Sequence, residues 1–235
     1  MIHEHQIVVP RTARYYSLGA AAAPLEQLWL VCHGYGQLAS RFITYFSAID
    51  AAHRLIVAPE ALSRFYLDEA SGGTHTEARV GASWMTREDR LSEIDDQARY
   101  LDALYTHIVG SLQGAPDELI VLGFSQGAAT AARWAVRSDL PVCRLILWGG
   151  RLPPDVDLGA HRDRLARMQL TLVVGDRDEY ISVQAAVDEQ ARIQRAGVPV
   201  ERIAFEGGHR LDKGVLRALA ARGGSTTSRR PPPGR

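Results

Sequence analysis

The sequence predicts an α/β fold, in which a mostly parallel central sheet has helices on both faces and an antiparallel pair of strands at its N-terminal edge. Two observations predict this fold. Short, uninterrupted runs of Val, Ile and Leu are typical of strands buried on both faces. These runs alternate along the chain with segments whose apolar residues recur every three or four positions, the period of a helix. With 235 residues, 46% hydrophobic and 23% charged, the chain is long enough to bury a core without disulfide or metal support.

The first elements are expected to be strands. Residues 5–9 and 14–18 are short apolar runs separated by Pro10, and they predict an antiparallel hairpin at the edge of the sheet. Residues 27–32 (QLWLVC) are continuously apolar and end before a His-Gly pair. This run predicts a strand in the interior of the sheet.

The next elements are a helix, a strand and a long loop. Residues 40–52 carry apolar side chains at helical spacing, and residues 55–58 (LIVA) predict a strand that stops at Pro59. Residues 60–85 show no period and contain several glycines, so we expect a long loop there. Because long loops are uncommon in compact domains and are often functional, this one is interpreted as a cap over the site.

The second half of the chain continues the alternation. Thr86 with Asp89 three residues later resembles a capping box and predicts the start of a helix whose apolar stripe continues to Ile108. Gly197 and Pro199 are typical of the end of a preceding helix. The remaining predicted strands are residues 119–122, 145–148, 170–174 and 200–205, and the remaining predicted helices are residues 126–136, 161–168, 182–196 and 212–221.

Composition divides the chain into one domain and a tail. Residues 222–235 (RGGSTTSRRPPPGR) contain four arginines, no acidic residue and no aliphatic side chain. Such a segment cannot bury enough apolar surface to offset its ordering entropy. We therefore expect a single domain over residues 1–221 and a disordered tail over residues 222–235.

Charge and cysteine content exclude several classes of protein. Lys and Arg together number 27, as do Asp and Glu, so no overall basic field argues for a nucleic-acid partner. Cys32 and Cys143 adjoin apolar runs and are predicted to be buried free thiols. The N-terminal residues lack the pattern of a signal peptide, and no apolar run approaches the ~18 residues of a membrane span. We expect a cytoplasmic protein, either a monomer or a homodimer.

A candidate nucleophile lies in residues 123–127, which read Gly-Phe-Ser-Gln-Gly. This G-x-S-x-G motif follows an apolar strand and precedes an Ala-rich helix, the context of a nucleophile elbow. The turn strains the backbone of Ser125, so the residues two positions away, Gly123 and Gly127, must be small. The elbow also places Ser125 at a helix N-terminus, where the helix dipole favours developing negative charge.

A serine nucleophile needs a base and an acid that orients it. His209 follows the last predicted strand, in the glycine-containing loop FEGGHR. This position agrees with the order along the chain, Ser then acid then His, of enzymes that have a nucleophile elbow. The loop after residues 170–174 supplies three carboxylates, Asp176, Asp178 and Glu179. Any one of the three could be the acid, and the others are then interpreted as turn residues or ion-pair partners.

The loop after residues 27–32, His33-Gly34-Tyr35-Gly36, is interpreted as part of an oxyanion hole. Its second donor would be the backbone N–H of Gln126, beside that of Tyr35. His33 has no second ligand at metal spacing, so it is interpreted as a structural histidine rather than a metal ligand.

With these residues in place, the sequence resembles the phospholipase/carboxylesterase family of α/β-hydrolases. This family includes small bacterial carboxylesterases and acyl-protein thioesterases. The resemblance covers residues 30 to 210. The matching segments are HGYG (33–36), APEA (58–61), SWMTRED (83–89), GFSQGAA (123–129), GGRLP (149–153), GDRDEYI (175–181) and GGH (207–209).

The resemblance implies an α/β-hydrolase fold and cofactor-independent serine hydrolysis of small-molecule carboxylic esters, thioesters or lysophospholipids. It implies Ser125 as nucleophile, His209 as base and Asp178, the last residue of G-x-x-D, as acid. The backbone amides of Tyr35 and Gln126 are the implied oxyanion donors.

The sequence departs from the usual family pattern at two places beside the acid. Val174 stands where many members have a histidine, and Ile181-Ser182 stands where many have Val-Pro. Residues 61–84 resemble the insert of a subgroup rather than a general family segment. These differences bear on the substrate and not on the triad.

Aromatic residues of the predicted loop are candidates for the substrate pocket. Phe65, Tyr66 and Trp84 lie among small polar residues, and Leu152 follows the GGR segment. Alternatively, the aromatic side chains anchor the loop to the body of the domain. Two other functions also stay open: lyase or perhydrolase chemistry with the same triad, and a non-catalytic binding protein with the same fold.

Overall fold

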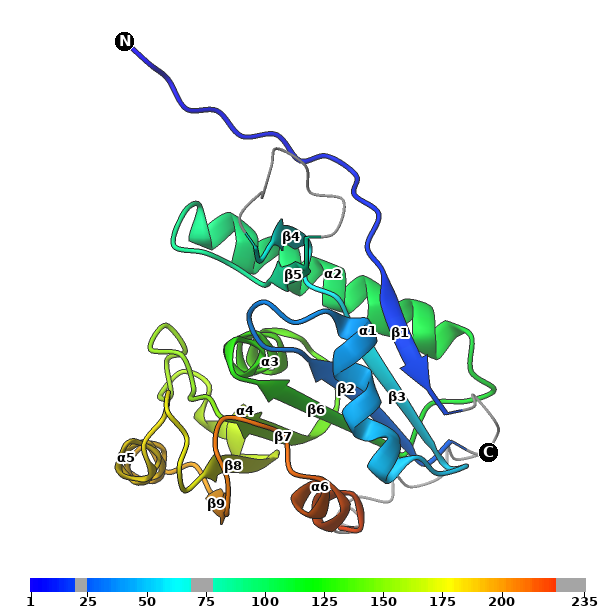
Figure 1. Ribbon diagram of the computed structural model, residues 1–235, viewed down its shortest axis with the longest axis vertical. Helices are drawn as coiled ribbons and strands as arrows, with labels where there is room; N and C mark the ends of the chain where they lie inside the picture. Colours follow the sequence, from blue (N-terminus) through cyan, green and yellow to red (C-terminus); the bar gives the residue numbers. More distant parts are fainter. Residues whose placement is uncertain (20–24, 69–77, 223–235) are drawn as a thin grey trace, which may run out of the picture.

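The computed structural model describes residues 1–19, 25–68 and 78–222 (Figure 1). Within these residues a seven-stranded sheet has the order β1-β3-β2-β6-β7-β8-β9. Edge strand β1 is antiparallel to β3, and all other neighbours are parallel. The strands are β1 (Tyr15–Leu18), β2 (Gln27–Cys32), β3 (Arg54–Pro59), β6 (Glu118–Phe124), β7 (Val142–Trp148), β8 (Gln169–Gly175) and β9 (Val200–Phe205).

Helices cover both faces of this sheet and form a separate core with each face. One core includes buried residues of α2 (Arg90–Gly110), α3 (Gln126–Arg137), α4 (Arg162–Ala166) and α5 (Val183–Arg195). The other core includes buried residues of α1 (Ala39–Phe42), the 3-10 helix η1 (Ile43–Ile49) and α6 (Lys213–Ala220).

Alternate residues of each central strand enter opposite cores. In β2, Leu28 and Leu30 pack in the first core, whereas Trp29 and Val31 pack in the second. An uninterrupted apolar run is therefore required, because both faces of the strand are removed from water. This arrangement confirms the predicted α/β fold with its mostly parallel sheet.

The antiparallel edge pair is present, but its partners differ from the predicted hairpin. Residues 5–9 form no strand, and β1 pairs with β3 instead. The pairing is extended by a hydrogen bond from the N–H of Glu60 to the carbonyl of Arg14, and by the ion pair between their side chains. These contacts fix the chain at the edge, while the residues at the N-terminus extend away from the sheet (Figure 1).

The segment predicted as a structureless loop contains a two-stranded antiparallel ribbon. Its strands are β4 (Ser63–Tyr66) and β5 (Val80–Ser83), and residues 69–77 lie outside the described part. The helix predicted from Thr86 begins instead at Arg90, because Asp89 has a left-handed backbone (φ 44°) and its side chain makes no capping hydrogen bond. The predicted helix 40–52 is divided into α1 and η1.

Both cysteines are free thiols, as predicted, but only Cys32 is buried; Cys143 is partly exposed. Of the predicted tail, residues 223–235 lie outside the described part, whereas Arg222 is described and forms an ion pair with Glu201. Among the described residues, no helix has both the length and the apolar character to cross a membrane.

Candidate active site

The predicted catalytic and oxyanion residues follow the carboxyl ends of four parallel strands, β2, β6, β8 and β9, and Leu152 follows a fifth, β7. Because these strands are parallel neighbours, their carboxyl ends lie at the same edge of the sheet, where open α/β sheets bind ligands. Loops that are far apart in the sequence therefore meet at this edge.

Ser125 lies in a sharp turn between β6 and α3. Its backbone has φ 55° and ψ −118°, a conformation that non-glycine residues rarely adopt. A Cβ atom on Gly123 would overlap the backbone of Gly127 and Ala128, and a Cβ atom on Gly127 would overlap the carbonyl oxygen of Cys32. Both flanking glycines are thus required by close backbone approach, as the elbow motif predicts.

His209 and Asp178 form a hydrogen-bonded pair across 31 residues of sequence. His209 Nδ1 and Asp178 Oδ2 are 2.8 Å apart, and the two side chains are only 10% and 2% exposed. The other oxygen of the carboxylate, Oδ1, accepts hydrogen bonds from the backbone N–H groups of Tyr180 and Ile181, each at 2.9 Å. The carboxylate is therefore fixed on both sides, and it faces the imidazole with one oxygen.

The other two carboxylates of this loop contact the backbone of the histidine loop. Asp176 Oδ1 accepts from the N–H of Gly207 at 2.8 Å, and Glu179 Oε2 accepts from the N–H of His209 at 3.2 Å. Of the three candidates that the sequence leaves open, only Asp178 is found hydrogen-bonded to the imidazole.

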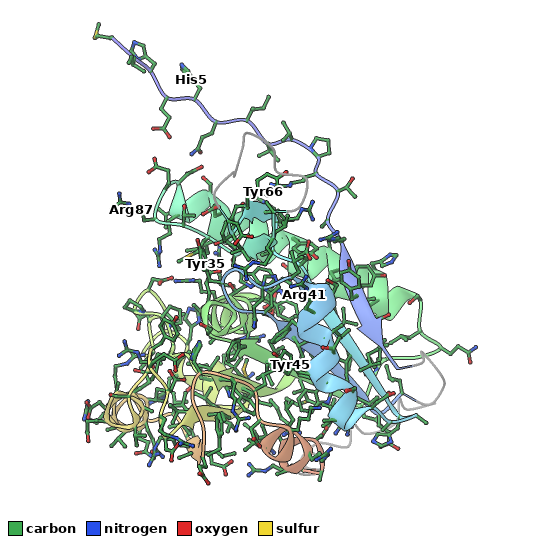
Figure 2. All side chains as sticks on the ribbon, viewed as in Figure 1. His5, Tyr35, Arg41, Tyr45, Tyr66 and Arg87 are labelled. Carbon is green, nitrogen blue, oxygen red and sulfur yellow. The ribbon has the colours of Figure 1, made fainter. Side chains whose placement is uncertain are left out.

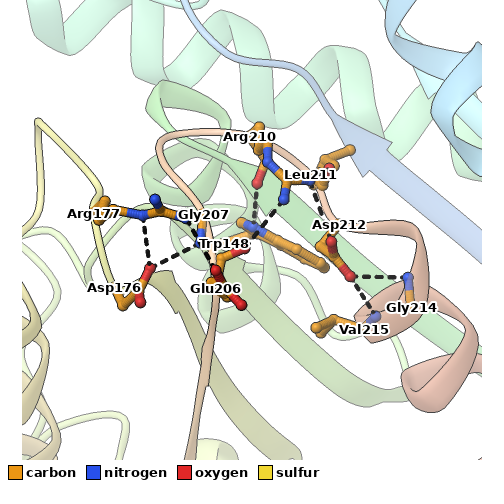
Figure 3. A network of polar contacts seen from close by, with 10 residues as sticks. All are labelled: Trp148, Asp176, Arg177, Glu206, Gly207, Arg210, Leu211, Asp212, Gly214 and Val215. Carbon is orange, nitrogen blue, oxygen red and sulfur yellow. Dashed lines mark hydrogen bonds and ion pairs between the residues drawn. The ribbon is translucent and has the colours of Figure 1, made fainter.

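The histidine loop is held to the sheet by a polar network (Figure 3). The indole N–H of Trp148, at the end of β7, donates to the carbonyl of Arg210 at 2.9 Å. The Arg210 guanidinium donates to the carbonyl of Glu206 and to the carboxylate of Asp212, which in turn caps α6. The loop is thereby fixed on both sides of His209.

Ser125 and the His209–Asp178 pair meet at the turn Gly149-Gly150. A Cβ atom on Gly149 would lie 2.8 Å from Cε1 of His209, and one on Gly150 would lie 3.0 Å from the carbonyl oxygen of Ser125. In addition, the ring of Phe124, the residue before Ser125, lies 4.8 Å from the His209 ring. The structure thus brings the elbow that carries Ser125 and the His209–Asp178 pair to the same turn.

Two backbone N–H groups beside Ser125 have no hydrogen-bond partner among the described residues, those of Tyr35 and Gln126. The loop that carries Tyr35 is close to the serine, because a Cβ atom on Gly34 would lie 3.2 Å from Cβ of Ser125. These two groups are the predicted oxyanion donors.

The conformation of the oxyanion loop is set by neighbouring segments. Gln37 Oε1 accepts from the N–H of Gly34 at 2.8 Å, and the N–H of Gly36 donates to the carbonyl of Ala82 in β5 at 2.9 Å. The ribbon therefore supports this loop. The side chain of Gln126 contributes as well, because its Oε1 accepts from the N–H of Trp84 at 3.0 Å.

His33 is a fully buried structural histidine, as predicted. The N–H of Ala61 donates to its Nε2 at 3.1 Å, so the ring proton is on Nδ1, which donates to the carbonyl of Gly34 at 2.7 Å. Burial lowers the pKa of His33, so the ring is held in its neutral form. Among the described residues no group of three His, Cys, Asp or Glu side chains could hold a metal ion.

The predicted pocket residues fall into two groups. Phe65 and Tyr66 lie on β4, where the Phe65 ring packs on the exposed ring of Tyr35 with centroids 5.1 Å apart, and Tyr66 is half exposed (Figure 2). Trp84 and Leu152 are buried in the core. The indole N–H of Trp84 donates to the carbonyl of His33 at 2.7 Å, which favours the anchoring interpretation for this residue.

Some residues of the site were not singled out by the sequence. Glu60 is buried and accepts hydrogen bonds from Arg14, Arg64 and the N–H of Ala39. Burial raises the pKa of Glu60, but the hydrogen bonds from Arg14 and Arg64, the charge of Arg14 and the N–H of Ala39 together hold that pKa below its usual value. The APE segment around Glu60 belongs to the family resemblance and was the available signal. Tyr180 likewise lies within the matching segment GDRDEYI, whereas Gln37 lies just outside HGYG and carried no such signal.

Comparison with known proteins gives the same family as the sequence motifs. The profile of the family described as Phospholipase/Carboxylesterase matches residues 15–221. No curated protein matches the sequence at a significant level.

Three solved structures illustrate the likeness of the fold. Esterase PE8 has 22% identity and a TM-score of 0.68, over 90% of this chain and 97% of its own. Acyl-protein thioesterase 2 from Zea mays has 17% identity and a TM-score of 0.67, over 89% and 99%. The Bacillus cereus carboxylesterase has 14% identity and a TM-score of 0.60, over 88% and 92%. At such identities these structures show that the fold is shared.

Proposed function

Because the chain belongs to the phospholipase/carboxylesterase family, we propose that it is a serine hydrolase that cleaves carboxylic esters of small to medium acyl groups, with thioesters or lysophospholipids as related substrates. The observation that carries this proposal is the Asp178–His209 pair, 2.8 Å apart, beside a serine in a strained elbow. Family membership alone supports a hydrolase of the carboxylesterase kind. The serine mechanism rests on the geometry.

The proposed reaction has two halves that use the same groups. Oγ of Ser125 attacks the carbonyl carbon of the substrate while Nε2 of His209 takes the hydroxyl proton. The tetrahedral oxyanion is stabilised by the N–H groups of Tyr35 and Gln126. When the carbon–oxygen or carbon–sulfur bond breaks, His209 returns this proton to the leaving alcohol or thiol, and Ser125 keeps the acyl group.

Water completes the cycle on the acyl-enzyme. His209 takes a proton from the water as it attacks, and Ser125 leaves with that proton, so that the carboxylic acid is released. Asp178 holds the imidazole with Nδ1 protonated and stabilises the imidazolium ion in both halves. Its low exposure strengthens this interaction, because little water competes for the carboxylate.

The experiment that tests the proposal is the Ser125→Ala variant, assayed with p-nitrophenyl esters of two to sixteen carbons. We expect loss of the nucleophile to lower kcat by about 10⁶, with folding retained. A fluorophosphonate should label the wild-type protein at Ser125 and leave the variant unlabelled. Retention of more than a few per cent of the activity in the variant, or no labelling of the wild type, would contradict the serine mechanism. The second result would favour a non-catalytic binding protein.

A further inference from the structure

Tyr180 is an exposed aromatic residue that contacts the imidazole of the candidate triad. Its ring centroid lies 4.7 Å from that of His209, with the two planes 58° apart, although 76% of the residue is exposed to solvent. The other ring that contacts His209 belongs to Phe124, which is buried. Tyr180 therefore contributes little to the core, and its ring lies at the solvent side of the site.

The position of Tyr180 is fixed by the carboxylate that orients the histidine. Its backbone N–H donates to Oδ1 of Asp178 at 2.9 Å, while Oδ2 of the same carboxylate contacts His209. The turn that presents the acid thus also presents the Tyr180 ring. Among the described residues its hydroxyl group has no hydrogen-bond partner, so the ring rather than the hydroxyl makes the contact.

The proposed reaction brings the leaving group to the same imidazole that this ring contacts. Since Nδ1 of His209 is occupied by Asp178, only Nε2 can protonate the departing oxygen or sulfur, which must come within about 3 Å of it. Atoms one or two bonds beyond the departing atom then lie within van der Waals reach of a ring that packs on the imidazole. The acyl oxygen is directed elsewhere, toward the N–H groups of Tyr35 and Gln126.

We propose that Tyr180 is a specificity-determining residue that packs against the alcohol or thiol part of the substrate and favours leaving groups that carry an aromatic ring. The proposal rests on the proposed ester hydrolysis. It specifies the substrates further, as esters or thioesters whose alcohol or thiol part carries an aromatic ring. Two aromatic rings in contact gain about 0.5–1.5 kcal/mol beyond their buried area, which corresponds to a preference of roughly two- to twelvefold.

The test compares benzyl acetate with ethyl acetate, because the two share an acyl-enzyme and differ only in the alcohol. The measured quantity is the ratio of the two kcat/KM values. Tyr180→Ala and Tyr180→Leu should lower this ratio by roughly two- to twelvefold, whereas Tyr180→Phe should keep it near the wild-type value. Tyr45→Ala is the matched control, because Tyr45 is an exposed tyrosine on η1 whose ring neighbour among the described residues is Phe42 (Figure 2). It should leave the ratio as in the wild type.

The possible outcomes separate specificity from support of the histidine. If Tyr180 only steadies His209, both esters lose the same factor and the pH profile of kcat/KM shifts, and this result would overturn the proposal. An unchanged ratio in a folded Ala or Leu variant would also overturn it. If the wild type hydrolyses neither ester, or if Ser125→Ala hydrolyses both esters as fast as the wild type does, the proposed function itself is wrong. This inference then fails with it.

Discussion

Replacement of Asp178 by Asn tests whether the acid works by fixing the protonation of the imidazole. The substitution keeps the shape of the side chain and changes one oxygen to an NH₂ group. Oδ1 of Asp178 accepts two backbone N–H groups, whereas Oδ2 accepts from Nδ1 of His209. If the NH₂ group took the place of Oδ1, it would face two other donors, and both hydrogen bonds would be lost. The amide oxygen therefore keeps the Oδ1 position, and the NH₂ group faces the histidine.

This orientation has a defined chemical consequence. An NH₂ group opposite Nδ1 makes that nitrogen an acceptor, so the ring proton moves to Nε2, which then cannot accept the proton of Ser125. The variant also loses the negative charge that stabilises the imidazolium ion. For a triad acid these two effects together lower kcat by roughly 10⁴, or about 5 kcal/mol in the activation barrier.

Asp176→Asn is the matched control, two residues away in the same loop. Asp176 Oδ1 accepts a single N–H group, from Gly207, and 49% of the side chain is exposed, so an amide oxygen can replace it. We expect kcat for this variant to stay within about tenfold of the wild type. The assay is kcat for a soluble p-nitrophenyl ester, with thermal unfolding of each variant as a check of folding. A value for Asp178→Asn within tenfold of the wild type, or a collapse in Asp176→Asn instead, would refute the reasoning.

Three further predictions follow from single sites. Because burial lowers the pKa of His33, the unfolded chain takes up a proton there at a higher pH than the folded protein, beginning near about pH 6.5. The free energy of unfolding should therefore fall from pH 7 to 5.5, by at most about 1.4 kcal/mol per pH unit, and urea titrations of His33→Gln should show a weaker dependence on pH. Gly127→Ala should destabilise the fold by about 1–3 kcal/mol or more and reduce activity, because its Cβ would overlap a backbone carbonyl. Gly110→Ala in α2 is the control: its Cβ would have open space around it, so the same titrations should show a neutral effect or a stabilisation of up to ~1 kcal/mol. Removal of residues 223–235, with Arg222 kept because it pairs with Glu201, should leave kcat/KM for soluble esters nearly unchanged; a tenfold loss would contradict this.

The inner strands β2, β3, β6, β7 and β8 were predictable because nearly every residue in them is buried. Strand β2 and the more exposed edge strand β9 have the predicted boundaries, and the other parallel strands begin or end within a few residues of theirs. Such a strand can be recognised from its own residues alone, since nearly every position must be apolar. The helices follow from the same argument, because each has one apolar face toward the sheet.

The edge elements were less predictable because their partners come from distant segments. Residues 5–9 are as apolar as a strand, yet β1 pairs with β3, which is about 40 residues later in the chain. Likewise, β4 alternates between partly buried and exposed residues, and β5 is rich in small residues. Neither sequence resembles a continuous apolar strand. Their pairing depends on contacts with each other and with the loop after β2, which no short window of sequence contains.

In the site, the residues carried by local motifs were predictable and the supporting contacts were not. The elbow glycines are determined by their own turn, so the sequence around Ser125 is sufficient to identify them. The choice among Asp176, Asp178 and Glu179 needed the family pattern, because all three are carboxylates of one loop. The structure distinguishes them by their partners. Asp176 accepts from the N–H of Gly207, Asp178 contacts the imidazole of His209, and Glu179 accepts from the backbone N–H of His209.

Trp84 illustrates why an aromatic residue in a loop is an ambiguous signal. The sequence offers it as a pocket residue, since a large apolar ring among small polar residues is available to a ligand. A buried indole, however, also needs an acceptor for its N–H group, and here the acceptor is the carbonyl of His33, the residue that begins the oxyanion loop. The backbone N–H of Trp84 is held in turn by the side chain of Gln126, whose own N–H is the second predicted oxyanion donor. Through this one residue the ribbon, the oxyanion loop and the N-terminus of α3 are connected, so the contacts of Trp84 favour a supporting position beside the two proposed oxyanion donors.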